Sequence, residues 1–141
     1  MANGIALSSD GKQVFVGELV GQSVVVFDRD QRTNTLTRNR SIPVGTGVDN
    51  LTFADSGLLY IAGHPKLLSL ALGYQRREDQ PSPSEVVSLD PATDHIGRVF
   101  IDDGQQHAAS SVALVDTVLD RIFIGSAFGP HVSVCDSEAA L

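Results

Sequence analysis

Tryptophan is absent from this 141-residue chain, and Phe and Tyr bring the aromatic share to only 6%. So few rings argue against a stacking platform for single-stranded nucleic acid. Basic side chains are also scarce, because 10 Lys and Arg face 17 Asp and Glu and leave a net charge of −7. That balance excludes the basic face with which proteins bind a phosphate backbone, so we expect no nucleic-acid partner.

Cys135 is the single cysteine, so no disulfide within the chain can stabilise the fold. No apolar run approaches the roughly 18 residues of a membrane helix, and we expect no membrane span. No basic and apolar leader precedes the polar residues that begin at Ser8. As written, the chain would stay in the compartment where it is made, although a longer parent could be secreted. Its 42% hydrophobic residues against 19% charged ones are sufficient for a packed core.

Glycine and proline are spread along the chain and divide it into short segments rich in β-branched residues. None of these segments has a convincing helical period. We therefore predict an all-β protein with eleven short strands and no helix. The predicted strands cover residues 5–7, 14–16, 23–27, 51–53, 58–62, 67–72, 85–89, 99–101, 112–115, 121–125 and 132–135.

A pattern of strand, Asp- or Gly-containing turn and second strand occurs three times. It reads GIALSSDG with VFVG from residue 4, NLTFADSG with LYIAG from residue 50, and SVALVD with IFIG from residue 111. A third strand is predicted after each pair, at 23–27, 67–70 and 132–134. Antiparallel repeats of roughly 50 residues are typical of β-propeller blades. A β-sandwich also has short strands and regular turns, but the internal repetition favours the propeller.

The repeats predict about three four-stranded blades, which divide the chain at 1–47, 48–95 and 96–141. Ile5, Leu51 and Val112 are taken as equivalent positions. The interval from Leu51 to Val112 is longer than that from Ile5 to Leu51. The polar segment 74–83, which we interpret as a surface loop, explains the difference. The outer strands are less clear: they are expected at 38–44 in the first blade and 85–89 in the second, with 99–101 unplaced.

A longer motif opens the chain, where residues 3–12 read NGIALSSDGK and VFVGEL follows at 14–19. This stretch resembles the paraoxonase/arylesterase family, in which an NGIxxSxDGK pattern precedes an aromatic strand and EL. The likeness continues in the same order to the end of the chain, through VDNL at 48–51, GHP at 63–65, SEV at 84–86, SSVA at 110–113, IGSAF at 124–128 and Cys135.

Membership of that family would imply a six-bladed propeller that carries calcium in its central tunnel and hydrolyses esters and lactones. The present sequence resembles only the C-terminal half of such a protein. The resemblance therefore implies three blades of a Ca²⁺-dependent arylesterase or lactonase, with a small ester or lactone as substrate. Gluconolactonase-type and strictosidine-synthase-like propellers share this architecture and remain alternatives.

Three residues match the family's side-chain ligands of the catalytic calcium: Asn3, Asp49 and Asn50. Asn3 and Asp49 occupy the same place in their repeats, just ahead of an inner strand, so a propeller would direct both toward one axis. Calcium takes 6 to 8 oxygen ligands, so three side chains leave its coordination incomplete. The alternative is that these residues only form turns.

His64 matches a family histidine near the pocket and is the candidate catalytic base or hydrogen-bond partner. A solvent-facing histidine at a strand end is the alternative. Phe128 matches a pocket aromatic, and Ser110 and Ser111 match hydroxyl residues at the pocket rim. For these three, a plain core phenylalanine and two turn serines are the alternatives. Gly63 stands where the family has a cysteine.

A second class of function is a non-catalytic half-propeller that binds itself or a partner. Half a ring leaves two blade faces uncovered, and exposed apolar faces of that size tend to associate. Two copies would close a six-bladed homodimeric ring by twofold symmetry. Such a dimer would bring two sets of Asn3, Asp49 and Asn50 to one axis.

Overall fold

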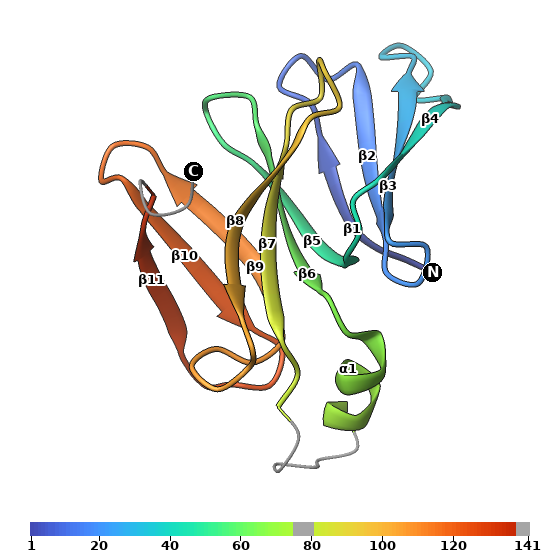
Figure 1. The fold of residues 1–141 in the computed structure, drawn as a ribbon. Helices are drawn as coiled ribbons and strands as arrows, with labels where there is room; N and C mark the ends of the chain where they lie inside the picture. The colour runs from blue at the N-terminus through green and yellow to red at the C-terminus, as the bar shows by residue number, and fades with distance from the viewer. Residues whose placement is uncertain (75–80, 138–141) are drawn as a thin grey trace.

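The computed structural model describes residues 1–74 and 81–137. In that part of the chain, eleven strands form three antiparallel sheets in which neighbours along the chain pair with one another (Figure 1). The first sheet contains β1 (Ala2–Leu7), β2 (Gln13–Glu18), β3 (Ser23–Arg29) and β4 (Leu36–Pro43). The second contains β5 (Gly47–Phe53), β6 (Leu59–His64), β7 (Ser84–Leu89) and β8 (Ile96–Asp102), and the third contains β9 (Ser110–Asp116), β10 (Arg121–Ser126) and β11 (Val132–Asp136).

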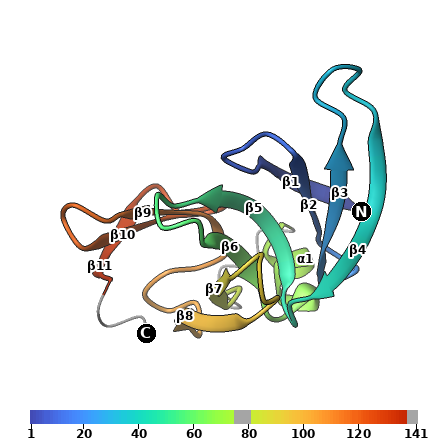
Figure 2. The ribbon, with the colours of Figure 1, turned by 90° about the horizontal axis from the view of Figure 1, so that it is seen from above.

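The three sheets are arranged as propeller blades around a common side. Seen from above, β1, β5 and β9 lie along the inner, concave side, and β4 and β8 lie outside (Figure 2). The predicted all-β propeller is therefore confirmed. In the described residues the third blade has three strands rather than the expected four. No helix in this part of the chain is long and apolar enough to cross a membrane.

One predicted strand is wrong. Residues 67–72 belong to helix α1 (Leu67–Tyr74), so the expectation of a protein without helices is also wrong. Leu, Ala and Ser are not β-branched, and Leu and Ala favour helices, so this short apolar run has no preference for a strand. The predicted loop at 74–83 lies largely outside the described residues.

The second sheet consequently uses different outer strands from those expected. Its third strand is β7, whereas the segment 85–89 had been assigned to the outer position. Its fourth strand is β8, which contains the unplaced segment 99–101 and pairs with β7 through Val86 and Phe100. The second sheet therefore extends to Asp102, beyond the predicted division after residue 95.

Apolar side chains fill the two spaces between neighbouring sheets. Eleven buried residues form the cluster between the first and second sheets: Phe15, Val24, Val26, Ile42, Val44, Val48, Leu51, Leu59, Ile61, Val87 and Leu89. A smaller cluster between the second and third sheets contains Val86, Val99, Ala113, Ile122 and Ile124. Each sheet is therefore fixed against the next by burial of apolar area, which holds the inner strands in place.

A buried histidine anchors the third sheet to the connection that precedes it. His107 is 1% exposed, and its Nδ1 lies 2.8 Å from Oγ of Ser133 on β11. Its ring also packs edge-to-face against Phe100 and His131, with centroid separations of 6.2 and 5.9 Å. Burial is the main cause that lowers the pKa of His107, and the positive charge of His131 lowers it further, whereas a Gly125 carbonyl and Asp102 oppose the shift.

We expect the protein to lose stability on acidification through His107. Its pKa in the folded state lies below the ordinary value of 6.5, so unfolded chains bind more protons as the pH falls. The contribution of neutral His107 to the free energy of unfolding is complete above about pH 6.5 and is lost as the pH falls toward the folded-state pKa. The melting temperature, followed by circular dichroism between about pH 8 and pH 5, should fall less in a His107→Gln variant. An equal fall in both proteins would contradict the assignment to this residue.

Candidate functional site

The inner strands β1, β5 and β9 each carry a β-bulge near their N-terminal ends. In β1 the regular pairing is interrupted between Ala2 and Ile5, and in β5 between Val48 and Leu51. In β9 the interruption lies opposite Gly125 and Ser126. Bulges redirect side chains near functional sites. The residues inside these bulges are Asn3 and Gly4 in β1, Asp49 and Asn50 in β5, and Ser111 in β9.

The pairing also corrects the equivalence of the third repeat. Ile5 pairs with Val16 and Leu51 pairs with Ile61, whereas the corresponding pair in the third sheet is Ala113 with Ile124. Ala113 is therefore the equivalent position, one residue later than the predicted Val112. The reason is that an apolar residue, Val112, stands where the first two repeats have Gly4 and Asn50, so the apolar pattern points one residue too early. Ser111, two residues before Ala113, is consequently the structural equivalent of Asn3 and Asp49, which lie two residues before Ile5 and Leu51.

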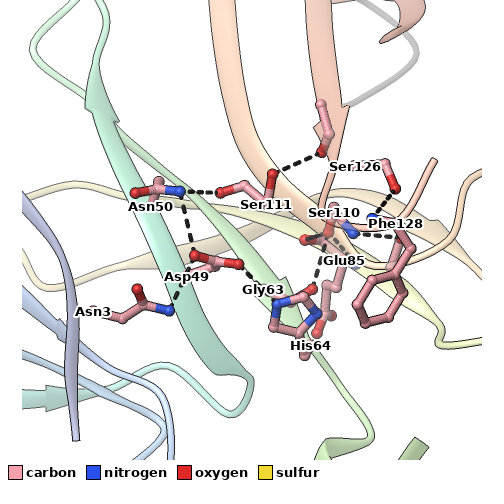
Figure 3. Close-up of polar contacts among 12 residues, drawn as sticks. Asn3, Asp49, Asn50, Gly63, His64, Glu85, Ser110, Ser111, Ser126 and Phe128 are labelled. Carbon is pink, nitrogen blue, oxygen red and sulfur yellow. Dashed lines mark hydrogen bonds and ion pairs between the residues drawn. The ribbon is translucent and has the colours of Figure 1, made fainter. Parts of the chain in front are cut away.

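A single carboxylate connects the residues at this end of the three sheets (Figure 3). Oδ1 of Asp49 accepts hydrogen bonds from Nδ2 of Asn3 at 3.0 Å and from Nδ2 of Asn50 at 3.2 Å. Oδ2 of Asp49 lies 3.0 Å from Nε2 of His64, and Nδ2 of Asn50 donates to the Ser111 carbonyl at 2.7 Å. We call these five residues, Asn3, Asp49, Asn50, His64 and Ser111, the axial cluster.

The two sides of the axial cluster differ in their access to solvent. The His64 side chain is 1% exposed and that of Asp49 is 13% exposed, whereas Asn3 and Asn50 are exposed. Nδ1 of His64 is buried and has no hydrogen-bond partner. A buried imidazole nitrogen without a hydrogen bond costs free energy, so a partner that bound to this atom would recover that cost.

The donor set of the axial cluster fits a hard cation. Asp49 supplies carboxylate oxygens, and each amide of Asn3 and Asn50 can present its oxygen after rotation about its last side-chain bond. Oxygen-only donors of this kind suit Ca²⁺, which takes 6 to 8 of them. No group of three or more His, Cys, Asp and Glu side chains that could hold a metal occurs in residues 1–74 and 81–137. A cation at this site would therefore depend on amide oxygens.

Ser110 does not join the axial cluster. It is fully buried, and its Oγ lies 3.0 Å from the carbonyl oxygens of both Gly63 and Glu85. The same Oγ accepts a hydrogen bond from the backbone N–H of Glu85 at 3.2 Å. Ser110 thus connects β9 to β6 and β7, whereas its neighbour Ser111 offers a carbonyl to the cluster.

Phe128 follows β10 and is 38% exposed. Its backbone N–H donates to Oγ of Ser126 at 3.1 Å, which fixes the turn after the strand. Figure 3 shows its ring on the side of the third sheet, at the same end of the propeller as His64. The structure therefore brings together Asn3, Asp49, Asn50 and His64 by direct contact and leaves Ser110 and Phe128 at its margin.

Glu85 is a buried charged residue that our sequence reasoning did not single out. Its side chain is 6% exposed, and Oε1 accepts a hydrogen bond from Nε of Arg98 on β8 at 2.9 Å. The signal was present in the sequence, because an acidic residue within the apolar strand 85–89 requires a partner. Glu85 fixes the outer strands behind Ser110 and His64 (Figure 3).

Solved structures confirm the architecture. A structure from Bacteroides fragilis NCTC 9343 superposes with a TM-score of 0.64 at 12% identity, covering 99% of this chain and 36% of that one. A luciferin-regenerating enzyme gives a TM-score of 0.61 at 19% identity, covering 90% of this chain and 38% of that one. At these identities the likeness shows the fold alone.

Sequence comparison is more specific. Human serum paraoxonase/arylesterase 1 is 28% identical over 131 residues, and rat serum paraoxonase/arylesterase 2 is 30% identical over 132 residues. Human serum paraoxonase/lactonase 3 is 30% identical over 131 residues. In each case the match covers 90% of this chain and 35% of the relative, so the chain spans about a third of these relatives' length. The model of the arylesterase family matches residues 1–136, and the chain belongs to that family.

Proposed function

We propose that this chain supplies three blades and one part of the active site of a six-bladed, Ca²⁺-dependent hydrolase of carboxylic esters or lactones. The observation that carries the proposal is the axial cluster, in which a carboxylate, two amides and an imidazole converge at the inner ends of the blades. Family membership supports the reaction class, since the relatives are described as paraoxonase/arylesterase and paraoxonase/lactonase.

Asn3, Asp49 and Asn50 are the residues that would hold calcium. When bound, the ion would supply Lewis-acid polarisation of an ester or lactone carbonyl. Three oxygen-bearing side chains provide about half of the 6 to 8 ligands that calcium takes, so further donors are required. We infer that the remaining ligands come from other blades of the ring.

His64 is the proposed base. With its proton on Nε2, it donates to Oδ2 of Asp49 at 3.0 Å, which orients the ring and stabilises the imidazolium formed later. Nδ1 is then the basic atom, and no partner competes for its lone pair. Because Nδ1 is buried, its surroundings would have to open to admit a water, which would then lose its proton to Nδ1 and attack the carbonyl carbon.

A second candidate function is self-association of a half-propeller without catalysis. The outer face of the first sheet exposes Ile5 and Leu7, which are 68% and 49% exposed. The open face of the third sheet exposes four apolar side chains, those of Val112, Leu114, Val132 and Val134. Within the chain, the corresponding faces are covered by the next sheet. A second copy would cover both open faces and would bring a second set of ligands to the axis.

One experiment separates these functions. The purified chain is fractionated by size with light scattering, and each fraction is assayed with phenyl acetate and a lactone, with and without Ca²⁺. We expect the monomer to be inactive and Ca²⁺-dependent hydrolysis to require an assembly with further blades. In that assembly His64→Gln should lower the rate by about 100-fold or more, whereas His95→Gln, at an exposed turn, should not. An active monomer would refute the incompleteness of the site, and an inactive dimer would favour self-association alone.

A further inference from the structure

The amide groups of the axial cluster have only one favourable orientation in this structure. Nδ2 of Asn50 lies between two acceptors, Oδ1 of Asp49 at 3.2 Å and the Ser111 carbonyl oxygen at 2.7 Å. Turning this amide over would direct its oxygen at two other oxygens. The same argument applies to the amide of Asn3, because its Nδ2 lies 3.0 Å from the same Asp49 oxygen. The hydrogen-bonding partners therefore determine which end of each amide faces the carboxylate.

Cation binding requires the opposite orientation. A Ca²⁺ ion next to Asp49 would repel the NH₂ groups and attract the amide oxygens. Each amide therefore has two exclusive states, with nitrogen toward the carboxylate when no cation is present and oxygen toward the cation when one is bound. Rotation of Asn50 would also release the Ser111 carbonyl, which then becomes a further oxygen at the same place.

The hydrogen bonds of these side-chain amides connect three sheets. Asn3 belongs to β1, Asp49 and Asn50 belong to β5, and Ser111 belongs to β9. Their hydrogen bonds therefore join the inner strands of neighbouring blades directly, in addition to the apolar contacts between the sheets.

We propose that Asn3 and Asn50 form an amide switch. Without a cation, their NH₂ groups replace it by donating to Asp49 and Ser111 and hold the blades together; with Ca²⁺, both amides rotate and become ligands. The identity of the cation rests on the proposed function, whereas the donor role of the amides rests on the hydrogen bonds alone. The switch explains how a calcium site is kept assembled before the ion arrives.

The decisive variant is Asn50→Asp, which keeps the shape and the oxygen ligand but replaces the NH₂ donor with a second carboxylate. We expect its melting temperature in EDTA to fall by about 5 °C or more, and Ca²⁺ to restore it. The matched control is Asn39→Asp, because Nδ2 of Asn39 also donates to a carboxylate, Oδ2 of Asp28 at 2.7 Å, on an exposed outer strand. The control should show no Ca²⁺-dependent recovery.

Two further measurements keep the switch separate from the proposed function. In the wild-type protein, the side-chain NH₂ signals of Asn3 and Asn50 in ¹H–¹⁵N spectra should shift on addition of Ca²⁺. Unchanged signals under conditions where calorimetry detects Ca²⁺ binding would overturn the rotation. A melting temperature of Asn50→Asp equal to that of wild type in EDTA would overturn the donor role. Absence of Ca²⁺ binding in calorimetry by an assembly with further blades would instead overturn the calcium assignment of the proposed function.

Discussion

Asp49→Ala is expected to lower the free energy of unfolding by about 3 kcal/mol and to weaken Ca²⁺ binding by roughly 100-fold or more. Asp49 is the shared acceptor of Asn3, Asn50 and His64, so its removal leaves three polar groups without their partner. The cost is highest at His64, whose ring is 1% exposed and already has one nitrogen without a hydrogen bond. Loss of the carboxylate also removes the charge that makes the cluster attractive to a dication.

Urea denaturation in EDTA measures the first effect, and calorimetric titration with Ca²⁺ of an assembly that contains further blades measures the second. Asp55→Ala is a suitable control, because Asp55 is an exposed carboxylate in the turn after the same strand, β5. We expect this control to change the unfolding free energy by less than about 0.5 kcal/mol. If the two variants behaved alike in both measurements, Asp49 would have no special place in the axial cluster.

Gly4→Ala is expected to be the most damaging of the small substitutions, with a loss of about 3 kcal/mol. A Cβ atom at Gly4 would lie 2.7 Å from Cα of Asn50 and even closer to the carbonyl oxygen of Asp49. Both obstacles are backbone atoms, so β1 and β5 would have to separate. That separation would also move Asn3 away from Asp49, and we expect Ca²⁺ binding to weaken together with stability.

Gly57→Ala provides the comparison for Gly4→Ala. Gly57 has a φ of +86°, but no atom lies within 4 Å of a Cβ placed there. Its substitution should therefore cost only the backbone strain of a positive φ, about 1 kcal/mol, and leave Ca²⁺ binding unchanged. Denaturation curves of the two variants, recorded side by side, test the argument. A loss at Gly57 as large as that at Gly4 would show that the close approach of β1 and β5 does not limit this site.

The blade organisation could be read from the sequence because each repeat carries its own turn chemistry and β-branched strands. Residues 67–72 could not be assigned in this way, since a short run of Leu, Ala and Ser fits a buried strand and a helix equally well. The register of the third repeat was also hidden. Apolar Val112 stands where the other repeats have Gly4 and Asn50, and only the pairing of Ala113 with Ile124 reveals the correct register.

Part of the candidate site could be predicted from the family resemblance together with the repetition. Asn3 and Asp49 were expected in equivalent places near one axis, and their side chains are joined by a hydrogen bond of 3.0 Å. The pairing of His64 with Asp49 could not be expected, because it depends on how β6 ends beside the bulge of β5. Their roles as ligands and base remain predictions that the proposed variants test.

The bulges at the inner strands also suggest how a propeller acquires new chemistry. Three structurally equivalent slots hold Asn3, Asp49 and Ser111, which differ in charge, hydrogen-bonding capacity and affinity for metal ions. The residues two positions later, Ile5, Leu51 and Ala113, are all apolar. One position in each blade therefore carries its own chemistry on a repeated strand framework. A ring built in this way allows its central chemistry to diversify one blade at a time.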